Sequence, residues 1–301
     1  MPSKDERIAH TACTNADVWV VENGRSFAIP DELAVEEPLE IRLAAGSNSL
    51  PVAVTMRTPG HDRELAAGFL FSEQIIRSRD DVRSVTEGID ARPAGKATFV
   101  AVEIVEAPAS SIARLERHFF ASSACGVCGK SEIESVVLGK VLERRNDLRL
   151  DVEVLYALPD RLRAEQTAFG KTGGLHAAAL FSLDGTLVAV REDVGRHNAL
   201  DKLLGWALLD GRMPLRDAVI LVSGRASYEL VQKCSMAEVP VMCAVSAPSS
   251  MAVTLARRLG LTLVGFLRGR RLNVYAGGEC ISAVAEASST HRSPGPKNGI
   301  C

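Results

Sequence analysis

The sequence predicts an α/β fold, in which a smaller α+β domain precedes an α/β/α sandwich domain. Two observations lead to this prediction. Strand-like segments dominate the first third of the chain, and from about residue 130 helical segments alternate with short apolar runs such as AVILV at 218–222. Continuous short apolar runs between helices are typical of strands buried on both faces. At 301 residues the chain is also long enough for two domains.

The first domain, expected over residues 16–115, contains one helix among several strands. The helix is predicted at 62–76, with Asp62 as its N-cap, and residues 87–97 are predicted to form a loop. Strands are predicted from β-branched, partly alternating segments at 17–21, 39–43, 51–57 and 98–105. This mixture indicates a small α+β domain.

The second domain, expected over residues 116–285, alternates helices and strands. Helices are predicted at 131–144, 159–168, 195–209, 226–236 and 249–259. Strands are predicted at 177–182, 186–191, 217–222, 240–245 and 261–266. The polar ends of the chain, residues 1–15 and 286–301, are expected to be flexible tails because they offer little apolar surface to bury.

Charge and hydropathy exclude several classes of function. A formal net charge of −2 argues against a general binder of nucleic acid or of anionic membranes, so any basic site must be local. The longest apolar runs are far shorter than the 18 or more residues of a membrane-spanning helix, and the N-terminus has no apolar signal region. We therefore expect a cytoplasmic protein with no membrane insertion.

A pair of cysteines stands out among the seven in the chain. Cys125 and Cys128 lie three residues apart in SSACGVCGKS at 122–131, and a glycine follows each. If this loop leads into the helix predicted from 131, the helix dipole and Lys130 would stabilise a thiolate. A low-pKa, accessible thiolate is a nucleophile, and a persulfide is one species that it can carry. Thiol chemistry is therefore the favoured interpretation.

Three other interpretations of this segment remain possible. A structural zinc site needs four ligands and the sequence has no second CxxC, although His176 or His197 could contribute. A thioredoxin-type centre fits the order of elements poorly. A phosphate-binding P-loop would need glycine where Ala124 stands, although GKS at 129–131 matches. We expect no permanently bound metal.

Two histidine-containing segments are candidates for ligand contact. In TGGLH at 172–176, two glycines precede His176 and suggest a close approach of the backbone to a ligand, although a hydrogen-bonded core histidine is the commoner explanation. In REDVGRHN at 191–198, Asp193 is placed to cap the next helix, and Arg196 and His197 fall in its first turn, where an anion would be stabilised. A solvated, well-capped surface helix explains the second segment equally well.

Small or basic residues follow three successive predicted strands. These positions are the carboxyl ends of strands, where α/β folds bind ligands. The segments are SGRAS at 223–227, with Ser223, Gly224 and Arg225, then SAPSS at 246–250, and GFLRGRR at 265–271, with Arg268, Arg270 and Arg271. Such a cluster suits a multiply charged anion. No GxGxxG and no intact Walker A motif is present, so a standard NAD or ATP arrangement is not expected.

An ordered set of motifs resembles the FdhD/NarQ family, the sulfur-carrier accessory proteins of formate dehydrogenase. The motifs are EEPLEIRL (36–43), RTPGHDRELAAGFLFSE (57–73), SSACGVCGK (122–130), GGLHAAAL (173–180), REDVGRHNALDK (191–202), SGRASYELVQK (223–233) and NVYAG (273–277). The resemblance covers nearly everything between the two tails.

The resemblance implies a cytidine-deaminase-like second domain and a homodimer. It also implies a sulfurtransferase function, in which persulfide sulfur passes from a cysteine desulfurase to the molybdenum cofactor bearing two molybdopterin guanine dinucleotides, before that cofactor enters formate dehydrogenase. Cys125 would carry the persulfide and Cys128 would assist or also accept sulfur. The stretch where the family contacts the cofactor matches Phe266, Leu267, Arg268, Gly269, Arg270 and Arg271.

A deaminase-like fold does not imply deamination. Zinc deaminases need HxE before PCxxC, whereas here the CxxC precedes His176 and the residue two positions after that histidine is Ala178. Two other functions remain as alternatives to sulfur transfer. One is a non-catalytic chaperone that binds the molybdenum cofactor, and the other is an ATPase that uses the incomplete P-loop.

Overall fold

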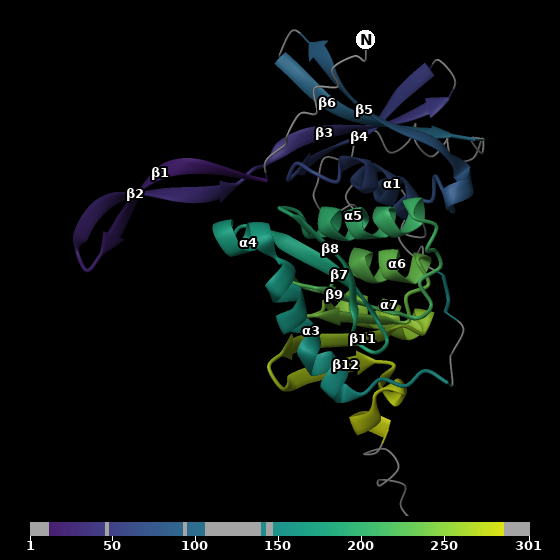
Figure 1. Ribbon diagram of the computed structural model, residues 1–301. Coiled ribbons are helices and arrows are strands. Elements are labelled where there is room, and N and C mark those ends of the chain that lie inside the picture. The colour runs from purple at the N-terminus through teal and green to yellow at the C-terminus, as the bar shows by residue number, and fades with distance from the viewer. Residues whose placement is uncertain (1–11, 46–47, 93–94, 106–139, 143–146, 286–301) are drawn as a thin grey trace, which may run out of the picture. The chain divides into compact units, whose positions relative to one another are not determined.

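The protein has a mixed α/β architecture (Figure 1), as the sequence predicts. The computed structural model describes residues 12–45, 48–92, 95–105, 140–142 and 147–285. The chain divides into two compact units. The first unit comprises Met1–Leu138, Ala164–Ala179 and Ala189–Met213. The second unit comprises Gly139–Arg163, Leu180–Val188 and Pro214–Cys301. The cytidine-deaminase-like topology stays a prediction.

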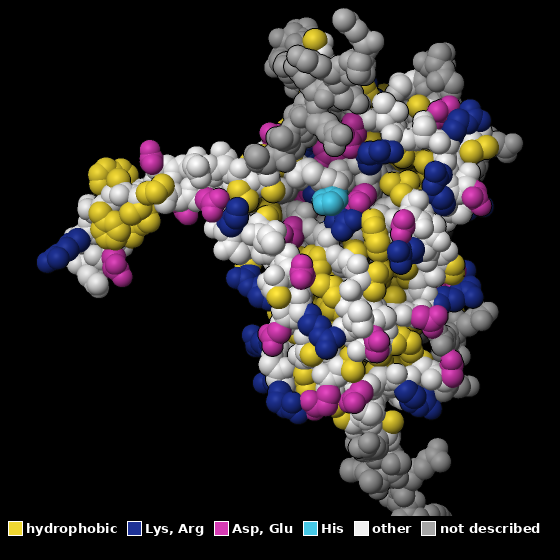
Figure 2. Space-filling view, viewed as in Figure 1, with side chains coloured by type: hydrophobic (Ala, Val, Ile, Leu, Met, Phe, Trp, Pro, Cys, Tyr) yellow, Lys and Arg dark blue, Asp and Glu magenta, His cyan; other side chains and the backbone are white. Residues whose placement is uncertain are grey.

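Two sheets lie in the first unit. Strands β1 (Cys13–Glu22) and β2 (Arg25–Ala34) form a two-stranded antiparallel sheet that bears exposed hydrophobic side chains (Figure 2). A four-stranded sheet has the order β4-β3-β6-β5, with a parallel β3–β6 pair at its centre. Its strands are β3 (Glu37–Ala45), β4 (Asn48–Arg57), β5 (Val82–Arg92) and β6 (Gly95–Ile104). Alternating residues of β3 and β6, among them Leu39, Ile41, Val100 and Val102, are fully buried and form its core face.

The helices of the first unit pack on that core. Helix α1 (Asp62–Ser72) contacts β3, β5 and β6 and packs along α5 (Arg196–Leu209). Nine of the fourteen residues of α5 are buried, and seven of these nine have no polar side-chain group, so the helix belongs to the core. The short elements η1 (Arg79–Asp81) and α4 (Thr167–Thr172) complete the unit.

A six-stranded sheet has the order β12-β11-β10-β9-β7-β8. Its strands are β7 (His176–Ser182), β8 (Leu187–Asp193), β9 (Ala218–Val222), β10 (Val241–Ala244), β11 (Thr262–Arg268) and β12 (Arg271–Ala276). Strands β9, β10 and β11 are parallel, and β12 pairs antiparallel to β11. Every residue of β9 and β10 is buried, as expected for strands covered on both faces. The helices of the second unit are α6 (Tyr228–Met236), α7 (Ser250–Leu259), most of α3 (Val152–Glu165) and η3 (Gly278–Cys280).

Several sequence predictions about single elements were wrong. Within the expected loop at 87–97, residues 87–92 are the end of β5 and residues 95–97 are the start of β6, and strands β2, β5 and β12 were not predicted. Helix α3 begins at Val152, seven residues before its predicted start, and accommodates Pro159 inside it. Helix α1 ends at Ser72, and its N-cap is His61, because the carboxylate of Asp62 binds Arg57 instead.

Two predictions about domain organisation stay predictions. The expected domain boundary at 115/116 lies outside the described residues, as does almost all of the helix predicted at 131–144. The first described strand, β1, begins at Cys13, within the segment that the sequence suggested as a tail.

Candidate functional site

The predicted sulfur-carrying cysteines, Cys125 and Cys128, lie outside the described residues. The structure does describe four other cysteines, and all four are free thiols. Cys234 and Cys243 are fully buried, and burial raises the pKa of both thiols far above the usual range. Cys280 is also buried and contacts the hydroxyl of Thr262. A buried thiol is out of reach of a second protein, so these three cysteines are unsuited to carrying sulfur.

The segments at the carboxyl ends of strands β9, β10 and β11 lie side by side in the second unit. We call residues 223–227, 246–249 and 266–271 the strand-end loops; the third comprises the last three residues of β11, the two-residue turn and the first residue of β12. The amide of Val245 donates to the carbonyl of Val222 at 3.1 Å, and the amide of Phe266 donates to the carbonyl of Ser246 at 3.1 Å. Ala226 and Pro248 form an isolated parallel bridge between the first two loops. The structure therefore brings Ser223, Gly224 and Arg225 to the same sheet edge as residues 266–271.

The third strand-end loop begins with a strained β-bulge. The register between β11 and β12 shifts between Gly265 and Arg268, and within the bulge Phe266 has a φ of +53°. A positive φ is unfavourable for an aromatic residue, and such strain is commonest at functional sites. Leu267 is fully buried and anchors the bulge. A Cβ atom on Gly265 would lie 2.9 Å from the ring of Pro248, so only glycine fits beside the second loop.

The arginines of the third loop form the tip of a β-hairpin. Arg268 lies opposite Arg271 in the β11–β12 register, and Gly269, with a φ of +53°, and Arg270 make the turn. All three arginine side chains are exposed, but Arg270 donates to both carboxylate oxygens of Glu153 at 2.7 and 2.5 Å. Hydrogen bonding to Glu153 raises the pKa of Arg270. Arg268 and Arg271 are therefore the better placed of the three to bind an anion in solution.

The remaining candidates lie in the first unit. Arg196 and His197 occupy the first turn of α5, as predicted, and His176 is the first residue of β7. All three are partly buried, and Nε of Arg196 is buried with no hydrogen-bond partner in the described part of the chain. Asp193 is not the N-cap of α5, which is Gly195. The sequence predicts that His176, Arg196 and His197 bind the same ligand as the strand-end loops, and this stays a prediction.

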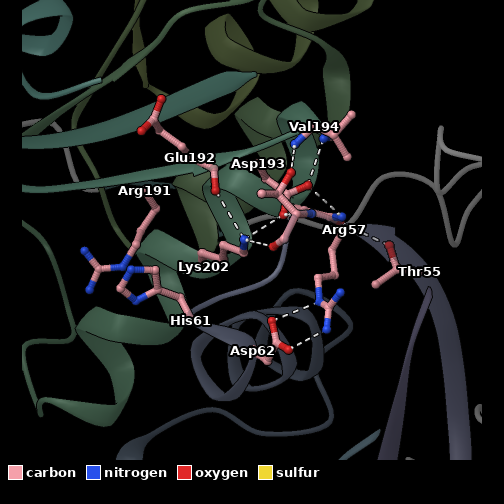
Figure 3. Close-up of polar contacts among 12 residues, drawn as sticks. Thr55, Arg57, His61, Asp62, Arg191, Glu192, Asp193, Val194 and Lys202 are labelled. Carbon is pink, nitrogen blue, oxygen red and sulfur yellow. Dashed lines mark hydrogen bonds and ion pairs between the residues drawn. The ribbon is translucent and has the colours of Figure 1, made fainter. Parts of the chain in front are cut away.

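A network of buried charges in the first unit was not predicted from the sequence (Figure 3). Lys202 of α5 and Asp193 at the end of β8 are 1% and 0% exposed, and Nζ lies 2.7 Å from Oδ2. The ammonium also donates to the carbonyls of Thr58 and Glu192 at 2.8 and 3.2 Å. All three ammonium protons therefore have acceptors, which is the condition for burying a charge.

The loop between β4 and α1 is the second half of this network. The amide of Thr58 donates to Oδ2 of Asp193, and the hydroxyl of Thr58 accepts from the amide of Val194. The buried guanidinium of Arg57 donates to both oxygens of Asp62 at 3.0 and 2.8 Å (Figure 3). The motifs RTPGHD and REDVGRHN, far apart in the sequence, are thus joined into one polar core. Each motif was noticed in the sequence, but nothing in a single sequence indicated that they pair.

Helices α1 and α5 cross at two glycines. A Cβ atom on Gly68 would lie 1.8 Å from the carbonyl oxygen of Asp201, and one on Gly205 would lie 1.8 Å from that of Glu64. The two backbones are therefore in direct contact at the crossing. This close approach holds Lys202, which lies between these contacts on α5, against the loop before α1.

A surface cavity of about 420 Å³ lies beside the crossing, lined in part by His61, Glu64, Glu87 and Trp206. His61 has a φ of +60°, and its Nδ1 lies 3.2 Å from Glu64. Arg191 donates twice to the Glu64 carboxylate, at 2.5 and 2.8 Å. Burial alone would raise the pKa of Glu64, but the hydrogen bonds from Arg191 and His61 outweigh it and lower that pKa.

No helix among the described residues is long and apolar enough to cross a membrane. They also contain no group of three or more His, Cys, Asp or Glu side chains that could hold a metal ion. Cys125 and Cys128, to which the zinc interpretation refers, lie outside those residues.

Comparison with known proteins gives consistent matches. The family model described as the FdhD/NarQ family matches residues 34–282. "Sulfur carrier protein FdhD" of Streptomyces avermitilis is 50% identical over 272 residues, which are 89% of this chain and 95% of that protein. The protein of the same name from Mycobacterium tuberculosis is 48% identical over 82% of this chain and 90% of that one.

A similar fold is known from a crystal structure. That structure is of a candidate formate dehydrogenase accessory protein from Desulfotalea psychrophila. Its sequence is 25% identical to this chain, and the two structures match with a TM-score of 0.68. The match covers 90% of this chain and all of that one.

Proposed function

Because the chain belongs to the FdhD/NarQ family, we propose that it is a sulfurtransferase that delivers sulfur to the molybdenum cofactor of a formate dehydrogenase. The sulfur comes from a cysteine desulfurase, and the acceptor is the cofactor with two molybdopterin guanine dinucleotides. The transfer takes place in the cytoplasm, before the cofactor enters the apoenzyme. The observation that carries the proposal is the family membership together with relatives named sulfur carriers.

In the first step, sulfur moves from the desulfurase to this chain. The thiolate of Cys125 attacks the outer sulfur of the desulfurase persulfide, and the sulfur–sulfur bond to the desulfurase cysteine breaks. That cysteine leaves as a thiolate, and Cys125 now carries the persulfide. The buried state of Cys234, Cys243 and Cys280 supports this assignment, because those thiols are inaccessible to a second protein.

In the second step, Cys128 releases the sulfur at the oxidation level of sulfide. The Cys128 thiolate attacks Sγ of Cys125, hydrosulfide leaves, and the two cysteines form a disulfide. Hydrosulfide then replaces an oxygen ligand of the molybdenum, which departs as hydroxide. The two electrons that reduce the outer sulfur come from the two thiols, and a cellular thiol reductant restores them.

The strand-end loops would hold the cofactor during transfer. Its dinucleotide phosphates are multiply charged, and Arg268 and Arg271 offer exposed guanidinium groups at the tip of the β11–β12 hairpin. Ser223, Gly224 and Arg225 lie at the same sheet edge and supply further donors. Because Phe266 is held in a strained conformation at the start of this loop, its backbone position is fixed before the cofactor binds.

Mass spectrometry after incubation with a cysteine desulfurase and cysteine tests the proposal. We expect the wild-type chain to gain one sulfur atom on the peptide that contains Cys125. Cys125→Ala should abolish this gain, whereas Cys128→Ala should retain and accumulate it, because the release step is blocked. Cys13→Ala is the matched control, since Cys13 is the partly exposed member of the four described cysteines.

Two outcomes would count against sulfur transfer. If the wild-type chain gains no sulfur, or Cys125→Ala gains as much as the wild type, the assignment fails. If the double variant Cys125→Ala/Cys128→Ala still supports formate dehydrogenase maturation in cells, the alternative of a non-catalytic cofactor chaperone is correct instead.

A further inference from the structure

The β1–β2 ribbon, residues Cys13–Ala34, is a regular hairpin. Its two ten-residue strands pair without interruption along their whole length. Asn23 and Gly24 form the turn with φ values of +50° and +74°, the type I′ geometry that matches the twist of the strands. Helix α4 contacts both strands, and Ala34 at the base of the ribbon lies beside Gly174. The base is therefore packed, whereas most of β2 is exposed.

The outer half of the ribbon carries apolar side chains on both faces. Trp19 and Val21 lie on one face and are 75% and 72% exposed. Phe27 and Ile29 lie on the other face and are 43% and 39% exposed (Figure 2). A two-stranded hairpin alone is only marginally stable in water, and three or more strands are usually needed. The ribbon is therefore an incomplete sheet that a further strand would stabilise.

The two edges of the ribbon differ. In a hairpin with a two-residue turn, the residues flanking the turn exchange hydrogen bonds, and such pairs then alternate along the strands. Counting from the turn, the backbone groups of Val21, Trp19 and Asp17 point away from β2. Pro30 lies opposite Asp17, so this outward-facing position on β2 has no N–H. The β2 edge is blunted and the β1 edge is open to a further strand.

The ribbon is acidic. It carries four carboxylates, on Asp17, Glu22, Asp31 and Glu32, and its single basic residue is Arg25. Glu22 lies opposite Arg25, so the three other carboxylates have no basic residue of the ribbon to balance them. A second copy of this chain would bring the same negative charges to the β1 edge, whereas a basic segment would be attracted to it. The same charges repel an anionic membrane surface. Charge therefore favours a basic protein segment as the occupant of this edge.

We propose that the β1 edge of the ribbon is a docking site for an extended segment of a different protein, one that carries β-branched apolar side chains and, near one end, a lysine or arginine. The segment adds to the ribbon as a third strand, and its backbone pairs with the outward N–H and C=O groups of Val21, Trp19 and Asp17. Its apolar side chains cover Trp19 and Val21. Its basic side chain lies beside Asp17, because opposite charges on neighbouring strands attract.

This docking site goes beyond sulfur transfer. The family match begins at residue 34, where the ribbon ends, so the ribbon precedes the part of the chain that the family model describes. Docking at the ribbon and sulfur transfer by Cys125 are therefore separate properties, and separate experiments test them.

A synthetic peptide with the proposed chemistry tests the docking site. The probe is Lys-Val-Lys-Val-Thr-Val-Thr-Val with a fluorescent label, and its anisotropy is followed during titration with the full chain. We expect saturable binding that Trp19→Lys/Val21→Lys weakens about tenfold or more, because two apolar contacts are lost and the edge gains positive charge. Replacing both lysines of the probe by glutamate should weaken binding to the wild type about threefold or more, because attraction becomes repulsion.

The matched control is Leu50→Lys/Val54→Lys. It places the same two charges on β4, an edge strand of the four-stranded sheet, at residues that are 54% and 66% exposed. This control should bind the probe like the wild type. If it loses as much affinity as the ribbon variant, total charge rather than the ribbon decides binding, and the proposal is overturned.

Hydrogen exchange identifies where the probe binds and what else covers the ribbon. The outward amides of Trp19 and Val21 should become protected when the probe is added, whereas those of Val18 and Val20, which already pair with β2, should change little. No binding, or binding without this protection, would overturn the proposal. Protection that is present without the probe would also overturn it. If that protection depends on protein concentration, a second copy is the occupant, and if it does not, a segment of the same chain is. None of these results depends on Cys125, so they are independent of the persulfide experiment.

Discussion

The polar core of the first unit and the arginine hairpin of the second unit use charged residues in opposite ways. Lys202 and Asp193 are almost completely buried, and each has several hydrogen-bond partners from the protein itself. Arg268 and Arg271 are exposed at the tip of the β11–β12 hairpin. A buried charge with all its partners in place has no capacity left for a ligand, whereas an exposed guanidinium retains all its donors.

This difference separates structural residues from candidate binding residues. Both regions come from motifs that resemble the same family, so the motifs alone do not distinguish their roles. Burial distinguishes the two roles. The buried polar core fixes the loop before α1 against α5, whereas the hairpin tip is open to solvent. Substitutions in the polar core should therefore change stability, and substitutions at the hairpin tip should change binding.

The largest expected effect is the loss of the buried ion pair. Lys202→Met leaves the Asp193 carboxylate buried without its cation and should lower the free energy of unfolding by about 3–5 kcal/mol. Urea denaturation followed by tryptophan fluorescence, to which Trp206 on the same helix contributes, measures it. The control is Lys140→Met, which removes an exposed cation from Glu238 and should cost about 1 kcal/mol or less.

The double variant Lys202→Met/Asp193→Leu sharpens this test. It removes both charges, so it should be more stable than Lys202→Met alone. If Lys202→Met and Lys140→Met lower the free energy of unfolding by the same amount, burial does not decide the role of these charges. The comparison between the two regions then fails.

A smaller loss is expected from the crossing of α1 and α5. Gly205→Ala places a methyl group where the carbonyl oxygen of Glu64 lies, so the helices must separate, at a cost of about 1–3 kcal/mol. Gly170→Ala is the control, because a Cβ atom there has no neighbour within 4 Å and alanine favours the helix. The same fluorescence measurement applies. An unchanged midpoint for Gly205→Ala would show that the crossing tolerates separation.

The sequence predicted the buried strands well because their physical signal is local. Strands β9, β10 and β11 are short apolar runs that each come after a polar turn or a helix, and the polar residues at their carboxyl ends must reach one sheet edge once the strands are parallel. The missed strands β2, β5 and β12 all lie at an edge of a sheet. An edge strand is free to carry charges, proline or glycine, so its sequence resembles a loop.

The polar core was not predictable because its signal is not local. A lysine on a helix is usually solvated, and nothing in the sequence of α5 marks Lys202 as an exception. Its burial follows from the contact with Thr58, which lies 144 residues earlier in the chain. Arg270 shows the same limit, since it lies in the turn of the β11–β12 hairpin and its partner Glu153 lies on helix α3, 117 residues earlier.

The smallest expected effect on stability comes from the hairpin tip. Arg271→Ala should change the free energy of unfolding by no more than about 0.5 kcal/mol, because the side chain is exposed. If the tip binds the phosphates of the cargo, the same change should weaken binding of GDP, a fragment of that cargo, about tenfold or more, which corresponds to the loss of one charge-assisted hydrogen bond. Calorimetric titration of the wild type and the variant measures it.

Arg270→Ala makes the hairpin prediction specific. Because Arg270 is held by Glu153, its loss should weaken GDP binding less than the loss of Arg271 does. The weakening caused by Arg271→Ala should also shrink as salt is added, since salt screens exposed charges. Equal binding by all three proteins would mean that the exposed arginines are merely solvated. Burial would then still identify the structural charges of the polar core, but exposure would not identify the binding ones.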